Sequence, residues 1–182
     1  DKIIPQIKAL VEEKAIVIPI MSYTIQTVDT TYGKAKDRIR LIESLTEHPI
    51  ITSIPEAEPL GPKKPLDCMV IAPLTGNSLS KLANALSDTP VLFAAKSTLR
   101  NERPVVLGIS TNDALGLNGM NLMRLISTKN IYFIPFGQDD PFKKPNSMIS
   151  NMDDLIKTVE FALNGKQIQP IILPYHRGSV VK

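Results

Sequence analysis

The sequence has one cysteine, two histidines and no long run of apolar residues. The single thiol, Cys68, excludes a disulfide within the chain, and a reducing compartment such as the cytoplasm is the simplest expectation. No stretch approaches the roughly 18 apolar residues of a membrane span, so no membrane contact is expected. The net charge is only +3, and lysines and arginines do not alternate with aromatic residues. No nucleic-acid partner is therefore expected.

The common nucleotide-binding and catalytic motifs are also missing. The chain contains neither G-x-G-x-x-G nor G-x-x-x-x-G-K-[ST], which excludes the usual dinucleotide loop and the P-loop. The segment Gly-Ile-Ser-Thr-Asn at residues 108–112 resembles a nucleophile elbow only in part, because Asn112 replaces the final glycine. His48 lies at a helix boundary and His176 near the C-terminus. Neither histidine falls where we expect a site.

The remaining composition is typical of a globular protein with one core. Hydrophobic residues make up 43% and charged residues 21% of 182 residues. We assign residues 1–173 to a single domain and residues 174–182 to a C-terminal tail. Apolar runs that alternate with amphipathic stretches favour an α/β fold, with a mainly parallel sheet between two layers of helices. Such folds normally begin with a strand, so we expect a first strand and its loop upstream of Asp1.

The spacing of apolar residues and prolines predicts the elements along the chain. Helices are expected at residues 3–11, 36–46, 79–86, 115–126 and 155–163. Strands are expected at residues 15–20, 90–94, 104–109 and 131–135, in the apolar run that ends at Pro73, and more weakly at 49–53 and 168–173. The proline-rich residues 55–65 are expected to form neither a helix nor a central strand. Residues 137–151 are expected to form a mobile loop.

The most informative segment follows the apolar run before Pro73. Small polar residues lead into an amphipathic stretch that predicts a helix, capped by Asn77 or Ser78. The free N–H groups at the start of a helix, with hydroxyl groups beside them, bind phosphate readily. This segment therefore predicts a mononucleotide or another phosphorylated cofactor at the carboxyl end of the sheet.

Three loops are expected to meet at that end of the sheet, at residues 22–24, 73–78 and 110–113. All three are rich in hydroxyl and amide groups and contain neither histidine nor cysteine. They suit a neutral ring and a phosphate, and no metal site is predicted. The same residue types also cap helices and form turns, and for any one loop alone this structural explanation is the better one. Three such loops together favour a ligand site, although a phosphosugar or nucleotide unrelated to flavin stays open.

Longer strings resemble a known family. Residues 71–84, Ile-Ala-Pro-Leu-Thr-Gly-Asn-Ser-Leu-Ser-Lys-Leu-Ala-Asn, resemble the Pro-Ala-Ser-Ala-Asn-Thr segment of flavoproteins of the flavin-dependent cysteine decarboxylase type. Residues 104–123 lie where that family has its Pro-x-Met-Asn-x-x-Met-Trp substrate loop. Residues 57–78, 109–119 and 130–139 carry a closer resemblance to one branch of the family. The resemblance covers about residues 1–173.

The resemblance implies a Rossmann-like flavoprotein that binds FMN and assembles as a homo-oligomer, either a trimer or a multiple of trimers. It places Asn112 toward the flavin ring or the substrate. The cofactor-binding residues that it implies are Ser22, Thr24, Pro73, Thr75, Gly76, Asn77, Ser78 and Ser110.

The closer branch implies a subunit that acts with a separate NAD(P)-binding subunit during sporulation. Together they oxidise a small cyclic dihydro diacid to pyridine-2,6-dicarboxylate. The decarboxylases have a catalytic histidine near the position of Pro59 and Leu60, where this chain has none, so cysteine decarboxylation is not expected. Asn112 and Asp113 are the catalytic candidates, with Asp113 as a proton acceptor. The alternative is a non-catalytic subunit that binds FMN or builds the complex.

Overall fold

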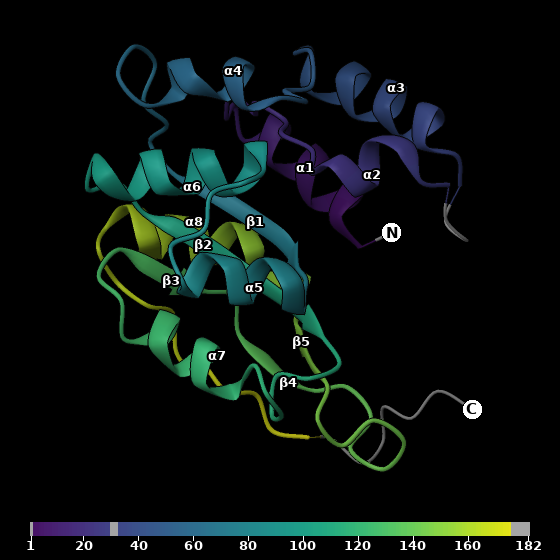
Figure 1. Cartoon of the computed structure of the whole chain (residues 1–182), viewed down its shortest axis with the longest axis vertical. Coiled ribbons are helices and arrows are strands. Elements are labelled where there is room, and N and C mark those ends of the chain that lie inside the picture. The colour runs from purple at the N-terminus through teal and green to yellow at the C-terminus, as the bar shows by residue number, and fades with distance from the viewer. Residues whose placement is uncertain (1, 30–32, 176–182) are drawn as a thin grey trace.

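A five-stranded mixed sheet forms the centre of the computed structural model (Figure 1), which describes residues 2–29 and 33–175. The strands are β1 (Met69–Leu74), β2 (Val105–Thr111), β3 (Ile131–Phe133), β4 (Phe136–Gln138) and β5 (Met148–Ser150). Strand β2 lies parallel to both β1 and β3. Its last residues pair with antiparallel β5, which in turn pairs with antiparallel β4. The sheet is therefore parallel across β1, β2 and β3, and antiparallel where the end of β2 meets β5 and β4.

Helices cover both faces of the sheet. The helices of these two layers are α1 (Ile3–Glu12), α5 (Gly76–Ala83), α6 (Pro90–Arg100), α7 (Gly119–Ile126) and α8 (Leu155–Leu163). Successive side chains of β2 point to opposite faces: Leu107 packs in the core with α5, α6 and α7, whereas Val106 packs with α8 and α1. These two cores define three layers, helix, sheet and helix.

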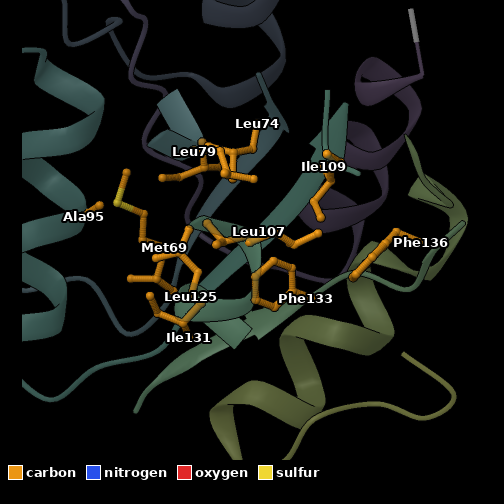
Figure 2. Close-up of a cluster of buried hydrophobic side chains, with 14 of the residues drawn as sticks. Met69, Leu74, Leu79, Ala95, Leu107, Ile109, Leu125, Ile131, Phe133 and Phe136 are labelled. Carbon is orange, nitrogen blue, oxygen red and sulfur yellow. The ribbon is translucent and has the colours of Figure 1, made fainter. Parts of the chain in front are cut away.

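The larger core lies beneath α5, α6 and α7. Figure 2 shows Leu107 of β2 and Phe133 of β3 close to Leu125 of α7. Leu107 and Leu79 are completely buried, and Phe133 is 1% exposed. Burying one such side chain contributes about 1.5–3 kcal/mol, so this core fixes the position of the helices that carry the site.

The N-terminal region forms a smaller unit beside the sheet. It contains α2 (Tyr23–Thr27), α3 (Ala35–Thr46), α4 (Ile54–Ala57) and the short 3-10 helix η1 (Glu58–Leu60). A second 3-10 helix, η2 (Met152–Asp154), lies outside this unit and directly precedes α8. Met21, Ile42 and Ile50 pack with apolar residues of α1 in a third core. No helix in the described ranges is long and apolar enough to cross a membrane.

The predicted α/β fold is confirmed, but the sheet is mixed rather than mainly parallel. The predicted loop at residues 137–151 contains most of β4 and all of β5, which pair through Gly137 and Ile149. The polar and proline residues between these short strands favour a loop, so the hairpin was not predicted from the sequence. Strand β5 lies between the end of β2 and strand β4. The domain limits and the first strand expected upstream of Asp1 stay predictions, and tail residues 176–182 lie outside the described residues.

Two predicted strands are reduced to single bridges. Of residues 15–20, only Ile20 pairs, through one parallel bridge to Ile51 in the weakly predicted segment 49–53. Residues 168–173 likewise contribute one bridge, between Ile172 and Phe136. Both segments are apolar, but within the described residues neither has a neighbouring strand along its length.

The predicted strand at residues 90–94 is wrong, because these residues begin α6. The side chain of Thr89 accepts a hydrogen bond from the Leu92 N–H at 3.2 Å and caps the helix. Pro90 occupies the first turn, where a missing N–H costs nothing. A short apolar run does not by itself distinguish a strand from a buried helix.

The proline-rich segment also contains helix, contrary to expectation. Ser53 and Glu56 form a capping box at the start of α4, and Pro55 lies in the first turn. Pro59 takes the equivalent place in η1. Helix α7 begins at Gly119, later than predicted, because residues 115–118 form turns. The helices predicted at 3–11, 36–46, 79–86 and 155–163 are confirmed within a few residues.

Candidate functional site

An open pocket lies where β1 and β2 end. Because these strands are parallel neighbours, the loops that follow them meet at one edge of the sheet. This main pocket has a volume of about 530 Å³ and is lined by Thr75, Gly76, Asn77, Ser80, Ser110, Thr111, Asn112, Asp113 and Asn118. The lining is rich in hydroxyl and amide groups, and Asp113 is the single charged residue among the described residues that form it.

The first turn of α5 forms one wall of the main pocket. Thr75 is the N-cap residue and its carbonyl accepts the first helical hydrogen bond, from the Leu79 N–H. The prediction that Asn77 or Ser78 caps the helix is therefore wrong, because both lie inside the first turn. The Thr75 hydroxyl lies 3.5 Å from the Ser78 hydroxyl, and the Thr75 side chain does not cap the first N–H groups. This helix start can donate hydrogen bonds to an anion.

Gly76 brings α5 unusually close to the loop after β2. A β-carbon at this position would lie 2.6 Å from the Thr111 hydroxyl oxygen and 2.7 Å from Oδ1 of Asp113. It would also lie 3.1 Å from Nδ2 of Asn118. The first two distances are shorter than real β-carbon contacts, so a side chain at position 76 would require Thr111, Asp113 or α5 to shift.

Asp113 organises the opposite wall. Its Oδ1 accepts a hydrogen bond from the Thr111 hydroxyl at 2.5 Å, and its Oδ2 accepts one from Nδ2 of Asn118 at 2.7 Å. Through these two hydrogen bonds the carboxylate joins the loop after β2 to the start of α7. The second bond is largely shielded from water, because Asn118 is 8% exposed. The arrangement favours a role in shaping the pocket, and the predicted role of Asp113 as a proton acceptor stays a prediction.

The hydrogen bonds continue away from the main pocket. Asn121 donates to Asn118 at 2.9 Å, and Asn84 donates to Asn121 at 3.2 Å. Arg124 donates to the side-chain oxygen of Asn84 at 2.9 Å and to the carbonyl of Ala83 at 3.2 Å. This chain of polar contacts connects the end of α5 to α7 and holds the two helices in a fixed relation.

A second hollow adjoins the main pocket. This side pocket has a volume of about 200 Å³ and shares Ser110, Thr111 and Asn112 with the main pocket. The rest of its lining comes from the β4–β5 hairpin and consists of Asp139, Lys144, Ser147, Met148 and Ile149. The Ser147 hydroxyl lies 3.5 Å from Oδ1 of Asn112 and 3.4 Å from Oδ2 of Asp139.

The structure brings together most of the residues predicted for the site. Those that line the main pocket are Thr75, Gly76, Asn77, Ser110, Asn112 and Asp113. Ser78 lies in the same helical turn but outside the lining, and Pro73 is exposed near the end of β1. Ser22 is the N-cap residue of α2, which contains Thr24, and neither residue lines the main or side pocket.

Ser80 and Asn118 line the main pocket but were not predicted from the sequence, whereas Thr111 belongs to the predicted loop at residues 110–113. Asn118 fell inside a predicted helix, and its contact with Asp113 depends on the turns that delay α7. Only the folded chain shows this contact.

No histidine or cysteine lines either pocket within the described residues. Leu60, in the segment where the resemblance led us to expect the decarboxylases' histidine, is buried in the core and 4% exposed. Cys68 directly precedes β1, and burial, with a smaller effect of the neighbouring Asp67 carboxylate, raises its pKa to about 12. Among the described residues, no group of three or more histidines, cysteines and carboxylates could hold a metal ion.

Comparison with known proteins places this chain in a known class. A family model described as Flavoprotein matches residues 2–159, and the chain belongs to the Flavoprotein family.

Two relatives of high identity define its position within that family. The chain is 62% identical to the B subunit of dipicolinate synthase from Bacillus subtilis (strain 168) over 179 residues, which is 98% of this chain and 90% of the relative. The crystal structure of the corresponding B subunit from Bacillus halodurans superposes with a TM-score of 0.89 at 58% identity, covering 96% of this chain and 90% of that one. The resemblance expected from the sequence is confirmed.

The decarboxylase resemblance holds at the level of the fold. The FMN-dependent cysteine decarboxylase SpaF superposes with a TM-score of 0.62 at 18% identity, covering 89% of each chain.

Proposed function

We propose that this chain is the B subunit of a dipicolinate synthase, which binds FMN and oxidises dihydrodipicolinate to dipicolinate during sporulation. The observation that carries the proposal is the 62% identity to the B subunit of a dipicolinate synthase over 98% of the chain. The layers of helices on both faces of the sheet support the finer assignment of a Rossmann-like flavoprotein fold.

The residues of the main pocket fit FMN. The first turn of α5 offers uncapped N–H groups and the hydroxyl of Thr75, which suit the phosphate. The amides of Asn77 and Asn112 and the hydroxyl of Ser110 line the same pocket and suit the polar edge of a flavin ring. We assign these residues to the cofactor and propose Ser78, Ser22, Thr24 and Pro73 as outer contacts.

The chain's own residues orient the reactants. When bound, FMN supplies a two-electron acceptor for the hydride that leaves the substrate ring, and aromatisation of that ring favours the reaction. Asn112 belongs to both pockets, so it would position the substrate against the cofactor. Asp113, the single carboxylate among the described residues of the main-pocket lining, could take the ring proton after releasing one of its two hydrogen bonds.

The partners follow from the same relationship. A B subunit acts with an A subunit, which we propose binds NAD(P). We also propose a homo-oligomer of this chain, a trimer or a multiple of trimers, in the cytoplasm.

A second function is favoured by one observation. Both carboxylate oxygens of Asp113 already accept hydrogen bonds, and neither pocket, within the described residues, offers a histidine as an alternative base. This arrangement suits a subunit that binds FMN and supports the A subunit without taking part in the chemistry.

Turnover by the complex separates the two functions. Dihydrodipicolinate oxidation is measured with the A subunit alone, with both subunits, and with Asn77→Ala or Asn112→Ala in this chain. Asn164→Ala, at the end of α8, is the matched control. We expect turnover to require this chain and to fall at least about tenfold in both pocket variants, with the fold intact by circular dichroism. Full activity in both variants would contradict catalysis at this pocket and favour the supporting role.

A further inference from the structure

The described lining of the main pocket includes no cation. It consists of hydroxyls, amides, one glycine and the carboxylate of Asp113. A diacid carries two negative charges, and carboxylates are bound most strongly by ammonium or guanidinium groups. The main pocket therefore explains the binding of a ring better than the binding of two carboxylates.

The side pocket contains a cation, Lys144, beside the carboxylate of Asp139. Among the described residues that line either pocket, Lys144 is the single lysine or arginine. The two pockets share Ser110, Thr111 and Asn112. A substrate ring beside the flavin in the main pocket would therefore lie next to the side pocket, whose lining includes Lys144.

The backbone around Lys144 is held firmly. Its N–H donates to the Asp140 carbonyl at 2.8 Å, and its own carbonyl accepts from the Ser147 N–H at 2.9 Å. The Leu115 N–H donates to the Asn146 carbonyl at 3.1 Å. This last bond ties the hairpin to the loop that carries Asp113, so the two pockets keep their relative positions.

The Lys144 side chain is loosely paired and able to change partners. Its Nζ lies 3.4 Å from Oδ2 of Asp139, and the two side chains are 55% and 26% exposed. An exposed pair at this distance is weak. Asp139 also accepts a hydrogen bond from the hydroxyl of Ser147, which is 2% exposed. Its carboxylate therefore keeps a hydrogen-bond donor when the Lys144 ammonium group binds another anion.

We infer that the side pocket is the subsite for one carboxylate of the substrate, and that the Lys144 ammonium group pairs with it in place of Asp139. The inference rests on the proposed function and extends it to the recognition of a planar ring with two carboxylates. Lys144 is a specificity residue in this assignment, and it distinguishes diacids from monoacids.

Binding of two probes tests the subsite. Dipicolinate, with two carboxylates, and picolinate, with one, are titrated by calorimetry into the FMN-loaded natural protein and into Lys144→Gln. Lys143→Gln is the matched control, because Lys143 is an exposed neighbour outside both linings. We expect Lys144→Gln to weaken dipicolinate binding about tenfold and to abolish most of the preference over picolinate. Lys143→Gln should keep both affinities within about twofold.

Equal dipicolinate affinity in the wild type and Lys144→Gln would overturn the subsite, and continued turnover by the complex would show that the proposed function stands. Absence of both dipicolinate binding and turnover in the wild type would overturn the function and the subsite together. The FMN phosphate is the other anion that Lys144 could serve, so FMN and riboflavin affinities are measured in parallel. A loss of FMN affinity with unchanged riboflavin affinity in Lys144→Gln would assign the lysine to the cofactor and contradict the subsite.

Discussion

At the scale of single residues, Gly76 determines how closely α5 approaches the Asp113 loop. We predict that Gly76→Ala weakens FMN binding at least about tenfold, because the added carbon would meet Thr111 and Asp113 at 2.6 and 2.7 Å. Fluorescence titration of FMN measures the effect.

Gly116→Ala is the control for this substitution. A β-carbon on Gly116 would meet the nearest atom, the Asp113 carbonyl oxygen, at 3.4 Å, which is an ordinary contact. FMN affinity in this variant should stay within about twofold of the wild type. Equal losses in both glycine variants would show that the close approach at Gly76 has no particular role.

Cys68 provides a residue-scale prediction about pH. Because burial and the Asp67 charge raise its pKa to about 12, the thiol stays protonated where an exposed thiol ionises. We predict alkylation by iodoacetamide at pH 8 at least about 100-fold slower in the native protein than in the denatured protein. Mass spectrometry of timed samples gives the two rates.

The same shift makes Cys68 a destabilising group at high pH. Below the pKa of 9.0 that a thiol has in the unfolded chain, the group is neutral in both states and has no effect. Above it the unfolded chain releases the proton more easily, so stability falls between pH 9 and about 12. Fast native alkylation at pH 8 would contradict this account.

Much of the candidate site could be predicted residue by residue. Thr75 to Asn77 and Ser110 to Asp113 follow apolar runs, and the ends of parallel strands meet in space. Asn118 could not be predicted, because its bond to Asp113 at 2.7 Å depends on the turns before α7. The Ser22 loop failed to reach the pocket because the strand expected before it is a single bridge.

At the scale of elements, α6 shows that N-terminal capping residues can decide for a helix where a short apolar run suggests a strand. Thr89 caps the helix through the Leu92 N–H, and Pro90 fits its first turn. We predict that Thr89→Ala lowers the free energy of unfolding by about 1 kcal/mol. Urea denaturation followed by circular dichroism measures the loss.

Thr89→Ser tests the cause of that loss. Serine keeps the hydroxyl acceptor and should retain most of the stability. A serine variant as unstable as the alanine variant would show that the methyl group of Thr89, rather than its hydroxyl, stabilises this end of α6.

The elements predicted well from the sequence are those with regularly spaced apolar residues and with residues that mark where a helix begins or ends. The α8 helix ends at Leu163 and is followed by Asn164 and Gly165, with the glycine at a φ of +68°, as the Asn-Gly pair indicated. The β4–β5 hairpin was missed because its strands are only three residues long each. Such strands form through their neighbours in the sheet rather than through their own pattern.

At the scale of the whole molecule, the mixed sheet explains why the two pockets adjoin. Parallel pairing of β1 and β2 creates the main pocket, and antiparallel pairing of β5 with Ser110 and Thr111 brings the hairpin beside it. A purely parallel sheet would have placed no hairpin there. The side pocket and Lys144 therefore follow from the part of the fold that the sequence did not reveal.

The visible absorbance spectrum of the natural protein, as purified and after addition of FMN, tests the central claim most directly. We predict a bound flavin spectrum, with shifted bands that survive gel filtration and are weakened by Gly76→Ala. Loss of all flavin on gel filtration, even after incubation with excess FMN, would contradict a cofactor site at the ends of β1 and β2.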